Sequence, residues 1–279
     1  MIAIVTDSTS SLSVEDAERE GITVVPLQVI IGADVYVEGH DVTADMIAEA
    51  LAGFVPVSTS RPTPDEFLAV YEKLAAEGAD AIVSVHLSSR MSGTLDSAVL
   101  ASKQASVPVT CIDSTQVGIA TGFAAGRAAQ ARDAGEDAVG VADAARRAGE
   151  SSTALLYVDT LEYLKRGGRV GSAAALIGSA LAVKPILTIT DGLVVPLERV
   201  RTKAKALARL EALAVEKAAS CDDGFDIGVQ HLASPTTAVA VAGRLATALG
   251  REAIAVDEVG AAIGAHVGPG MISVTITPR

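Results

Sequence analysis

The sequence predicts a two-domain α/β protein, with a mostly parallel N-terminal sheet flanked by helices and a second α/β domain that contains antiparallel strands. The length of 279 residues is near the point at which one hydrophobic core divides into two. Apolar runs alternate with helix-like segments through residue 112, a pattern typical of parallel sheets. After residue 153 the pattern changes, and Asp191-Gly192 separates two apolar runs, a pair that favours a tight antiparallel hairpin.

The first half of the chain is predicted to contain four strands and four helices. The strands are runs rich in Val, Ile and Ala, at residues 2–5, 22–31 (interrupted by Pro26), 81–85 and 107–112. The helices begin near residues 13, 44 and 64, and a fourth ends near residue 105. The strongest start signal is Thr63, because Glu66 completes a capping box and Pro64 occupies the first helical position. Gly78 is expected to end that helix.

The second half is predicted to mix strands and helices around the Asp191-Gly192 hairpin. The strands are expected at residues 154–158, 185–189, 193–197, 225–231 and 272–277, and the helices at 161–164, 170–181 and 202–218. The small residues of the helix at 170–181 would leave room for a chain to pass. Residues 149–153 are polar and loop-like, so we place the boundary there, which gives domains of residues 1–152 and 153–279.

Composition excludes several classes of partner. The net charge is −12 and the isoelectric point about 4.8, so nucleic-acid binding, which needs clustered Lys and Arg, is not expected. The two cysteines, Cys111 and Cys221, match no metal or redox spacing, and no metal site is expected. Aromatic residues make up 3% of the chain, so the core must be aliphatic, which suits an alkyl chain better than a stacked base.

The protein is expected to be cytoplasmic and to lack a transmembrane segment. No signal-peptide pattern precedes the first strand. The uncharged stretch from Val170 to Val183 has 14 residues, which is too few to span a bilayer. A transient contact with a membrane surface stays open at this point.

Five clusters of hydroxyl and glycine residues follow or flank the apolar runs. Hydroxyls beside backbone N–H groups at strand-to-helix turns form a nest for an anion. Ligands of open α/β sheets bind outside the carboxyl ends of the strands, where four of the five clusters are expected. The sequence therefore indicates a protein that holds a small acid, through the clusters at residues 7–10, 58–62, 87–94, 113–115 and 265–270.

The alternative interpretation of Thr59, Ser60 and Ser92 is helix capping, a common role of Ser and Thr at such turns. Thr63 already provides a cap just downstream, which frees Thr59 and Ser60 for another role. Ser92 with His266 also leaves open a hydrolase or phosphotransferase that acts on a small acid or an acyl phosphate. The sequence has no Gly-x-Ser-x-Gly elbow, P-loop or dinucleotide fingerprint, so we favour a binding protein without catalytic residues or a cofactor.

Seven short motifs occur in a fixed order along essentially the whole chain. They are Asp7-Ser8-Thr9, Thr59-Ser60-Arg61-Pro62, Leu87 to Thr94, Gly167 to Gly171, Lys184 to Leu187, Val200-Arg201-Thr202 and His266 to Gly270. The series resembles the DegV family of bacterial fatty-acid-binding proteins, the acyl-carrying subunits of fatty acid kinase systems. Each motif alone is weak, but all seven in order make the resemblance specific.

The resemblance implies a two-domain protein that encloses one long-chain fatty acid, with the carboxyl group near the domain interface and the tail in an aliphatic tunnel. By motif, Thr59 and Ser92 would bind the carboxylate, with Ser60 and Gly93 adjacent. His266 belongs to the His-x-Gly-Pro-Gly motif and is expected at the same site, in a loop whose glycines let the backbone approach the ligand. Neutral O–H and N–H donors suit a carboxylate that has to be released again.

The resemblance also implies a kinase partner that phosphorylates the bound carboxylate, after which the acyl phosphate would enter phospholipid synthesis. Arg166, Arg169 and Arg201 are exceptions on an acidic chain, and we expect them to form the docking patch for the kinase or to hold the acyl phosphate. Arg61 stands where the family often has Gln, which places a positive charge near the head group. The preferred chain length and the oligomeric state stay open.

Overall fold

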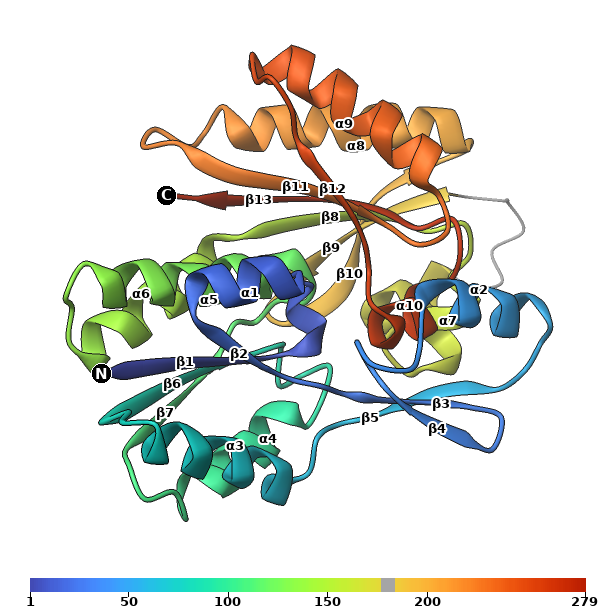
Figure 1. The fold of residues 1–279 in the computed structure, drawn as a ribbon. Helices are drawn as coiled ribbons and strands as arrows, with labels where there is room; N and C mark the ends of the chain where they lie inside the picture. The colour runs from blue at the N-terminus through green and yellow to red at the C-terminus, as the bar shows by residue number, and fades with distance from the viewer. Residues whose placement is uncertain (177–183) are drawn as a thin grey trace.

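The computed structural model describes residues 1–176 and 184–279, and it confirms the predicted fold class. A four-stranded parallel sheet and a six-stranded, largely antiparallel sheet are both covered by helices, and a small three-stranded sheet extends beside them (Figure 1). The helices α5 and α6 contact both large sheets and lie between them, which gives a layered α/β arrangement. The functional site has to be sought where these layers and the small sheet meet.

The N-terminal sheet has the strand order β2-β1-β6-β7, and all its pairs are parallel. Small alanine side chains of α5 and α6 pack on one face, whereas Phe67 and Tyr71 of α3 pack on the other face together with α4. The elements are β1 (Ile2–Asp7), β2 (Ile22–Val25), β6 (Ala81–His86), β7 (Val109–Asp113), the short helix η1 (Ser8–Ser10), α1 (Val14–Glu20), α3 (Pro64–Ala76), α4 (Thr94–Ser102), α5 (Ile119–Asp133) and α6 (Ala138–Ser151).

The predicted helix starts are confirmed at atomic level. The Thr63 side chain accepts a hydrogen bond from the Glu66 N–H at 3.2 Å, and the Glu66 carboxylate accepts one from the Thr63 N–H at 2.6 Å, so the capping box is complete. Ser13 caps α1 in the same way. Gly78 lies just beyond the end of α3 with φ of +100°, a conformation that glycine adopts at no steric cost.

The second large sheet has the order β10-β9-β8-β13-β11-β12, with one parallel pair at its β12 edge. Asp191 and Gly192 form the predicted hairpin with φ of +49° and +73°, as a tight turn between β9 and β10 requires. The elements are β8 (Thr153–Tyr157), β9 (Lys184–Thr190), β10 (Leu193–Val200), β11 (Phe225–His231), β12 (Ala255–Glu258), β13 (Ile272–Pro278), α7 (Glu162–Arg166), η2 (Gly171–Leu176), α8 (Lys203–Ala218) and α9 (Pro235–Leu249).

The small sheet is antiparallel and connects the two halves of the protein. It consists of β3 (Gln28–Ile31), β4 (Asp34–Val37) and β5 (Val57–Ser60) in the order β4-β3-β5. One of its faces packs against α2 (Ala44–Ala52) and α10 (Ala261–Val267) through an aliphatic cluster that includes Val29 and Ala262 (Figure 1). The helix α10, near the C-terminus, therefore packs against a sheet formed by the N-terminal part of the chain.

Several expectations require correction. The predicted strand at 22–31 is two strands in different sheets, because Pro26 interrupts the run and the chain turns away from β1. Of the predicted helix at 170–181, Val170 is not helical, residues 171–176 form a 3₁₀-helix, and residues 177–181 lie outside the described residues. His266 lies in the last turn of α10 rather than in a loop. The segment expected to be loop-like at the domain boundary is helical through Ser151, the last residue of α6, and the division between residues 152 and 153 stays a prediction.

Within the described residues, no helix combines the length and apolar character needed to cross a membrane. In the same part of the chain, no three His, Cys, Asp or Glu side chains group as a metal site requires.

Candidate functional site

A cavity lies where α10, the six-stranded sheet and the hydroxyl-rich turns of the N-terminal sheet meet. It is narrow, with an enclosed volume of about 80 Å³. Four polar side chains, Thr59, Ser92, Arg169 and His266, contribute to its wall together with Thr9. The remaining wall is aliphatic apart from one thioether, and consists of Leu27, Leu87, Met91, Val117, Leu156, Leu164, Val194, Ala262, Ile263 and Val267.

Thr59 and His266 are joined directly, although 207 positions separate them in the chain. Thr59 is on β5 and His266 on α10, and Thr59 Oγ1 lies 3.0 Å from His266 Nε2. His266 Nδ1 is buried and has no hydrogen-bond partner among the described residues. A buried orphan N–H is rarer than an orphan acceptor, so we assign the proton to Nε2, which then donates to Thr59. This leaves the Thr59 hydroxyl hydrogen free to donate into the cavity.

Gly167 makes room for the imidazole of His266. A Cβ at Gly167 would lie 2.1 Å from His266 Nδ1, far closer than any real contact. Burial, and to a smaller degree the positive charge of Arg169, lower the pKa of His266 to about 4. The ring is therefore neutral at physiological pH and acts as a hydrogen-bond donor, not as a cation.

Arg169 supplies the positive charge of the cavity. Its Nε donates to the carbonyl oxygen of Met91 at 3.0 Å, and its Nη1 donates to the carbonyl oxygen of Gly167. These two bonds fix the guanidinium between the Gly-rich bend and the loop before α4. A guanidinium has five N–H donors, so others remain for an anionic ligand.

Ser92 lies beside Met91 at the start of α4. Its Oγ accepts a hydrogen bond from the Thr94 N–H at 3.3 Å and lies 2.9 Å from Thr94 Oγ1. The helix has no side-chain cap from its N-cap residue, Gly93, so Ser92 takes over part of that role. Ser92 thus both supports the helix start and lines the cavity.

Arg61 and Gly93 form a second contact next to the site. Arg61 Nη1 donates to the Gly93 carbonyl oxygen at 3.2 Å, and a Cβ at Gly93 would collide with the guanidinium at 1.6 Å. Gly93 is therefore required for this arginine to lie flat against the loop. This hydrogen bond joins the residue after β5 to the residue before α4, so it connects the two segments that contain Thr59 and Ser92.

Four predicted residues do not line the cavity: Gly93, which lies against Arg61, and Ser60, Arg166 and Arg201. Ser60 follows Thr59 on a strand, so its side chain points to the opposite face of the small sheet, where its Oγ donates to the Arg61 carbonyl oxygen at 3.4 Å. Arg166 is exposed at the end of α7, and Arg201 is exposed between β10 and α8. The expected arginine group is thus divided, with Arg169 in the cavity wall and the other two on the surface.

The glycines of the His-x-Gly-Pro-Gly motif serve a purpose that differs from the expected one. A Cβ at Gly268 would lie 1.9 Å from the ring of Tyr163, and a Cβ at Gly270 would lie 1.9 Å from the carboxylate of Asp159. These glycines therefore allow the chain after α10 to pack against the segment that contains α7, and they do not face the cavity.

The structure contains a Ser–His–Asp arrangement that sequence reasoning missed. His86 Nδ1 lies 2.9 Å from Asp7 Oδ2, and His86 Nε2 lies 2.7 Å from Ser84 Oγ, which in turn lies 2.9 Å from the Tyr71 hydroxyl. All four side chains are fully buried, so no substrate reaches Ser84. Asp7 also accepts hydrogen bonds from the N–H groups of Thr9 and Leu87, which are both in the cavity wall, and so the network supports that wall.

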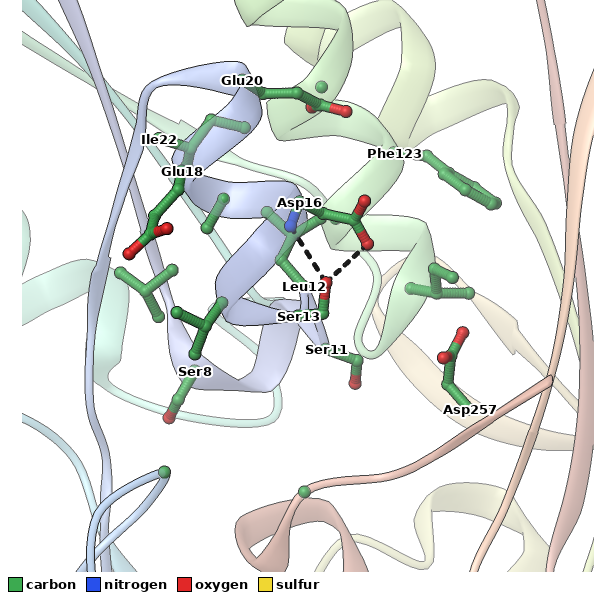
Figure 2. A pocket seen from close by; sticks show the side chains of 18 of the residues that line it. Ser8, Ser11, Leu12, Ser13, Asp16, Glu18, Glu20, Ile22, Phe123 and Asp257 are labelled. Carbon is green, nitrogen blue, oxygen red and sulfur yellow. Dashed lines mark hydrogen bonds between the residues drawn. The ribbon is translucent and has the colours of Figure 1, made fainter. Parts of the chain in front are cut away.

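Figure 2 shows a second, wider groove between α1, α5 and β12. The dashed lines join Ser13 and Asp16, and these are the capping bonds at the start of α1. Two arginines, Arg19 and Arg127, also line the groove, but acidic side chains outnumber them: Asp16, Glu18, Glu20, Glu38, Asp226, Asp257 and Glu258. Such a lining repels an anion, and the predicted carboxylate-binding residues all lie elsewhere.

Comparisons with known proteins agree with the fold and the motifs. The family model described as "Uncharacterised protein, DegV family" matches residues 1–279. A DegV domain-containing protein of Streptomyces coelicolor is 47% identical over 279 residues, which is 100% of this chain and 99% of the relative. A DegV family protein from Thermus thermophilus, solved for its fatty acid binding, superposes with a TM-score of 0.93 at 31% identity, covering 100% of this chain and 99% of its own.

A structure of DegV from Bacillus subtilis, described as a fatty acid binding protein, superposes with a TM-score of 0.91 at 32% identity and the same coverage. The family model and these relatives extend over the whole chain rather than over one domain. The chain therefore belongs to the DegV family.

Proposed function

We propose that this protein binds one long-chain fatty acid in the narrow cavity and holds it without chemical conversion. The observation that carries the proposal is a cavity wall that combines a few polar side chains, among them the hydrogen-bonded pair Thr59 and His266, with an otherwise aliphatic surface. A fatty acid has the same division. The relatives from Thermus thermophilus and Bacillus subtilis that are described as binding fatty acids support it.

The carboxylate would be bound by Thr59, Ser92 and Arg169. The hydroxyl of Thr59 is free to donate because His266 supplies the hydrogen that Thr59 accepts. Ser92 adds a second hydroxyl, and Arg169 adds a positive charge whose position is fixed by two carbonyl groups. Hydrogen bonds to a charged group contribute about 1.5–3 kcal/mol each, so the head group determines the orientation of the ligand.

The alkyl tail would supply most of the affinity. Burial of one CH₂ group contributes about 0.8 kcal/mol, so each CH₂ group of the tail that the aliphatic wall covers adds about that much before the loss of chain entropy. The walls contributed by Leu156, Val194 and Ile263 offer only aliphatic contact. Such a surface distinguishes poorly between tails that differ by a single CH₂ group.

A separate, cytoplasmic kinase would phosphorylate the bound carboxylate, and the acyl phosphate would then enter phospholipid synthesis. This step of the proposal rests on family membership and on two exposed arginines, Arg166 and Arg201, which are available to a partner. The hydrolase alternative has less support. His266 is hydrogen-bonded to Thr59 rather than to Ser92, so the proposed pair lacks the contact between nucleophile and base.

Ligand binding is tested by titrating delipidated protein with oleate and with methyl oleate, whose tail is the same but whose head is uncharged. The proposal predicts that oleate binds at least tenfold more tightly, and that Thr59→Ala reduces this preference. Ser60→Ala is the matched control, because it removes a hydroxyl from the adjacent residue on the opposite face of β5. Equal affinity for acid and ester, or equal effects of the two variants, would contradict the assignment.

The kinase step is tested by incubating the oleate-loaded protein with ATP and the fatty acid kinase of the same organism. The proposal predicts kinase-dependent acyl phosphate, with a lower rate for the variant R166E/R201E and unchanged oleate binding. Conversion of acyl phosphates or acyl esters by the protein alone would favour the hydrolase alternative.

A further inference from the structure

The helix α10 is the element on which the site depends most, and it is short. It has seven residues, four of which line the cavity: Ala262, Ile263, His266 and Val267. A helix of two turns is not stable by itself in water, and its position must be set by contacts with other segments. The side chain that holds its first turn therefore influences where His266 meets Thr59.

Glu38 makes that contact from the turn after β4. Its Oε1 accepts a hydrogen bond from the Ala262 N–H at 2.7 Å, and its Oε2 accepts one from the Ser8 hydroxyl at 2.5 Å. Ser8 Oγ in turn accepts a hydrogen bond from the Leu27 N–H at 2.9 Å. The carboxylate thus joins the end of β1, the start of β3 and the first turn of α10.

The fit around Glu38 is close. The residue is only 6% exposed and forms no ion pair with any described residue, which is unusual for a glutamate. Gly260 precedes α10, and a Cβ at that position would lie 2.3 Å from Glu38 Oε1. Gly260 has no side chain to cap the helix, so the cap is supplied by Glu38, which lies far away in the sequence. A carboxylate beside a helix N-terminus is favoured by the orphan N–H groups and by the helix dipole.

We propose that Glu38 is a positioning residue for the fatty-acid site: its hydrogen bond to the Ala262 N–H fixes α10 so that His266 Nε2 reaches Thr59 Oγ1. This rests on the proposed function for its effect on ligand binding, but not for its effect on the position of His266. Glu38 holds Ala262, and His266 lies one helical turn after Ala262 on α10. The hydrogen bond that His266 donates to Thr59 leaves the Thr59 hydroxyl free for the ligand.

Two substitutions of Glu38 distinguish the effect of its side-chain length from the effect of its negative charge. Glu38→Gln keeps the length of the side chain and an oxygen that accepts from Ala262, but it removes the charge. Glu38→Asp keeps the charge, but its side chain is one CH₂ group shorter and withdraws the acceptor from Ala262. Glu49→Ala is the control, because Glu49 is an exposed carboxylate on α2, the other helix that packs on the small sheet.

The readout is the ¹⁵N resonance of the His266 ring in delipidated protein, together with the dissociation constant for oleate. Positioning by the hydrogen bond predicts that Glu38→Asp shifts the His266 Nε2 resonance and weakens oleate binding at least tenfold. Glu38→Gln should stay within threefold of the original protein, and Glu49→Ala should change neither quantity.

The inference is overturned if Glu38→Asp leaves the His266 resonance unchanged, or if Glu38→Gln impairs the site as much as Glu38→Asp does. Failure of the unsubstituted protein to bind oleate would contradict the proposed function only, because the resonance of His266 in the lipid-free protein still reports on Glu38. If a variant unfolds, Ser8→Ala serves in its place, since it removes one of the two bonds to Glu38 and is expected to shift His266 in the same direction by a smaller amount.

Discussion

Replacing Gly167 by alanine is expected to damage the site by a purely steric route. The backbone of Gly167 has φ of −73° and ψ of −8°, which alanine adopts without strain. The added Cβ, however, would lie 2.1 Å from His266 Nδ1, about 1.3 Å short of the 3.4 Å at which ordinary contact begins. The imidazole has to withdraw by that amount, and its 3.0 Å bond to Thr59 is then lost.

The change in the free energy of unfolding has two destabilising contributions and one stabilising contribution. Overpacking of a well-filled site costs about 1–3 kcal/mol, and loss of one hydrogen bond adds about 1 kcal/mol. Replacing glycine by alanine in a conformation that alanine also adopts stabilises the folded protein by about 0.4–1 kcal/mol, because alanine lowers the conformational entropy of the unfolded chain. Gly167→Ala is therefore expected to lower the free energy of unfolding by about 1–3.6 kcal/mol, as measured by urea denaturation, and to weaken oleate binding.

Two further variants distinguish this explanation from a general effect of glycine substitution. Gly168 has φ of +72° and no atom within 4 Å of an added Cβ, so Gly168→Ala strains the backbone but leaves His266 in place and oleate binding intact. In a His266→Ala background the clash is gone, and Gly167→Ala should then cost almost nothing. An equal cost of Gly167→Ala with and without His266, or no effect on either quantity, would refute the reasoning.

Three other predictions follow from the site. The double variant T59A/S92A should lose about 2–5 kcal/mol of oleate affinity, measured by calorimetry, and about 2 kcal/mol of stability, because Thr59 also bonds His266 and Ser92 also bonds the Thr94 N–H. Arg169→Glu should abolish oleate binding, whereas Arg201→Glu should leave it intact, since only Arg169 lines the cavity; loss of binding in both would place Arg201 in the pocket. The pKa of His266 is lowered to about 4 in the folded protein, so the unfolded chain binds the extra proton between pH 6.5 and 4. The stabilisation is complete above pH 6.5 and is lost as the pH falls toward 4, by up to about 3 kcal/mol. Denaturation of His266→Gln across this range should show a flatter pH dependence than the original protein, and identical curves would contradict the assignment.

Local signals in the sequence were sufficient to predict most strands of the two large sheets and the starts of α1, α2, α3 and α8. A capping box, formed by Thr63 and Glu66, marks the start of α3, and the pair Asp191 and Gly192 marks the hairpin turn. Each signal lies within four consecutive residues. The helix α5 gave no such signal. It is buried on almost every side, and its Ala and Gly residues produce no apolar stripe of period 3.6. Its Gly122 lies against the Ser10 carbonyl oxygen, a contact that only the tertiary structure reveals.

For the candidate site too, local motifs predict some of the residues, whereas other features depend on contacts between distant segments. The motifs identified Thr59, Ser92 and His266, and the structure brings them to one cavity. Strand β5 is rich in Ser and Thr, and no strand is predicted from its sequence, so the alternation that turns Ser60 away from Thr59 is visible only in the structure.

The roles of Arg169 and Glu38 depend on partners far away in the chain. Arg169 is held by Met91, 78 positions earlier, and Glu38 bonds Ala262, 224 positions later. Neither contact has a local pattern, because each joins segments that are far apart in the sequence and meet only in the tertiary structure. A sequence motif identifies which residues are special, but not whether they face the cavity or the solvent.

The most direct test of the account is to denature the purified protein, extract it with organic solvent and identify any lipid by mass spectrometry. The account predicts close to one long-chain fatty acid per chain, or one per chain after delipidated protein is incubated with a fatty-acid mixture. The variant T59A/S92A should retain much less. Absence of fatty acid from the extract, together with no uptake on addition, would contradict the central claim that this cavity holds a fatty acid.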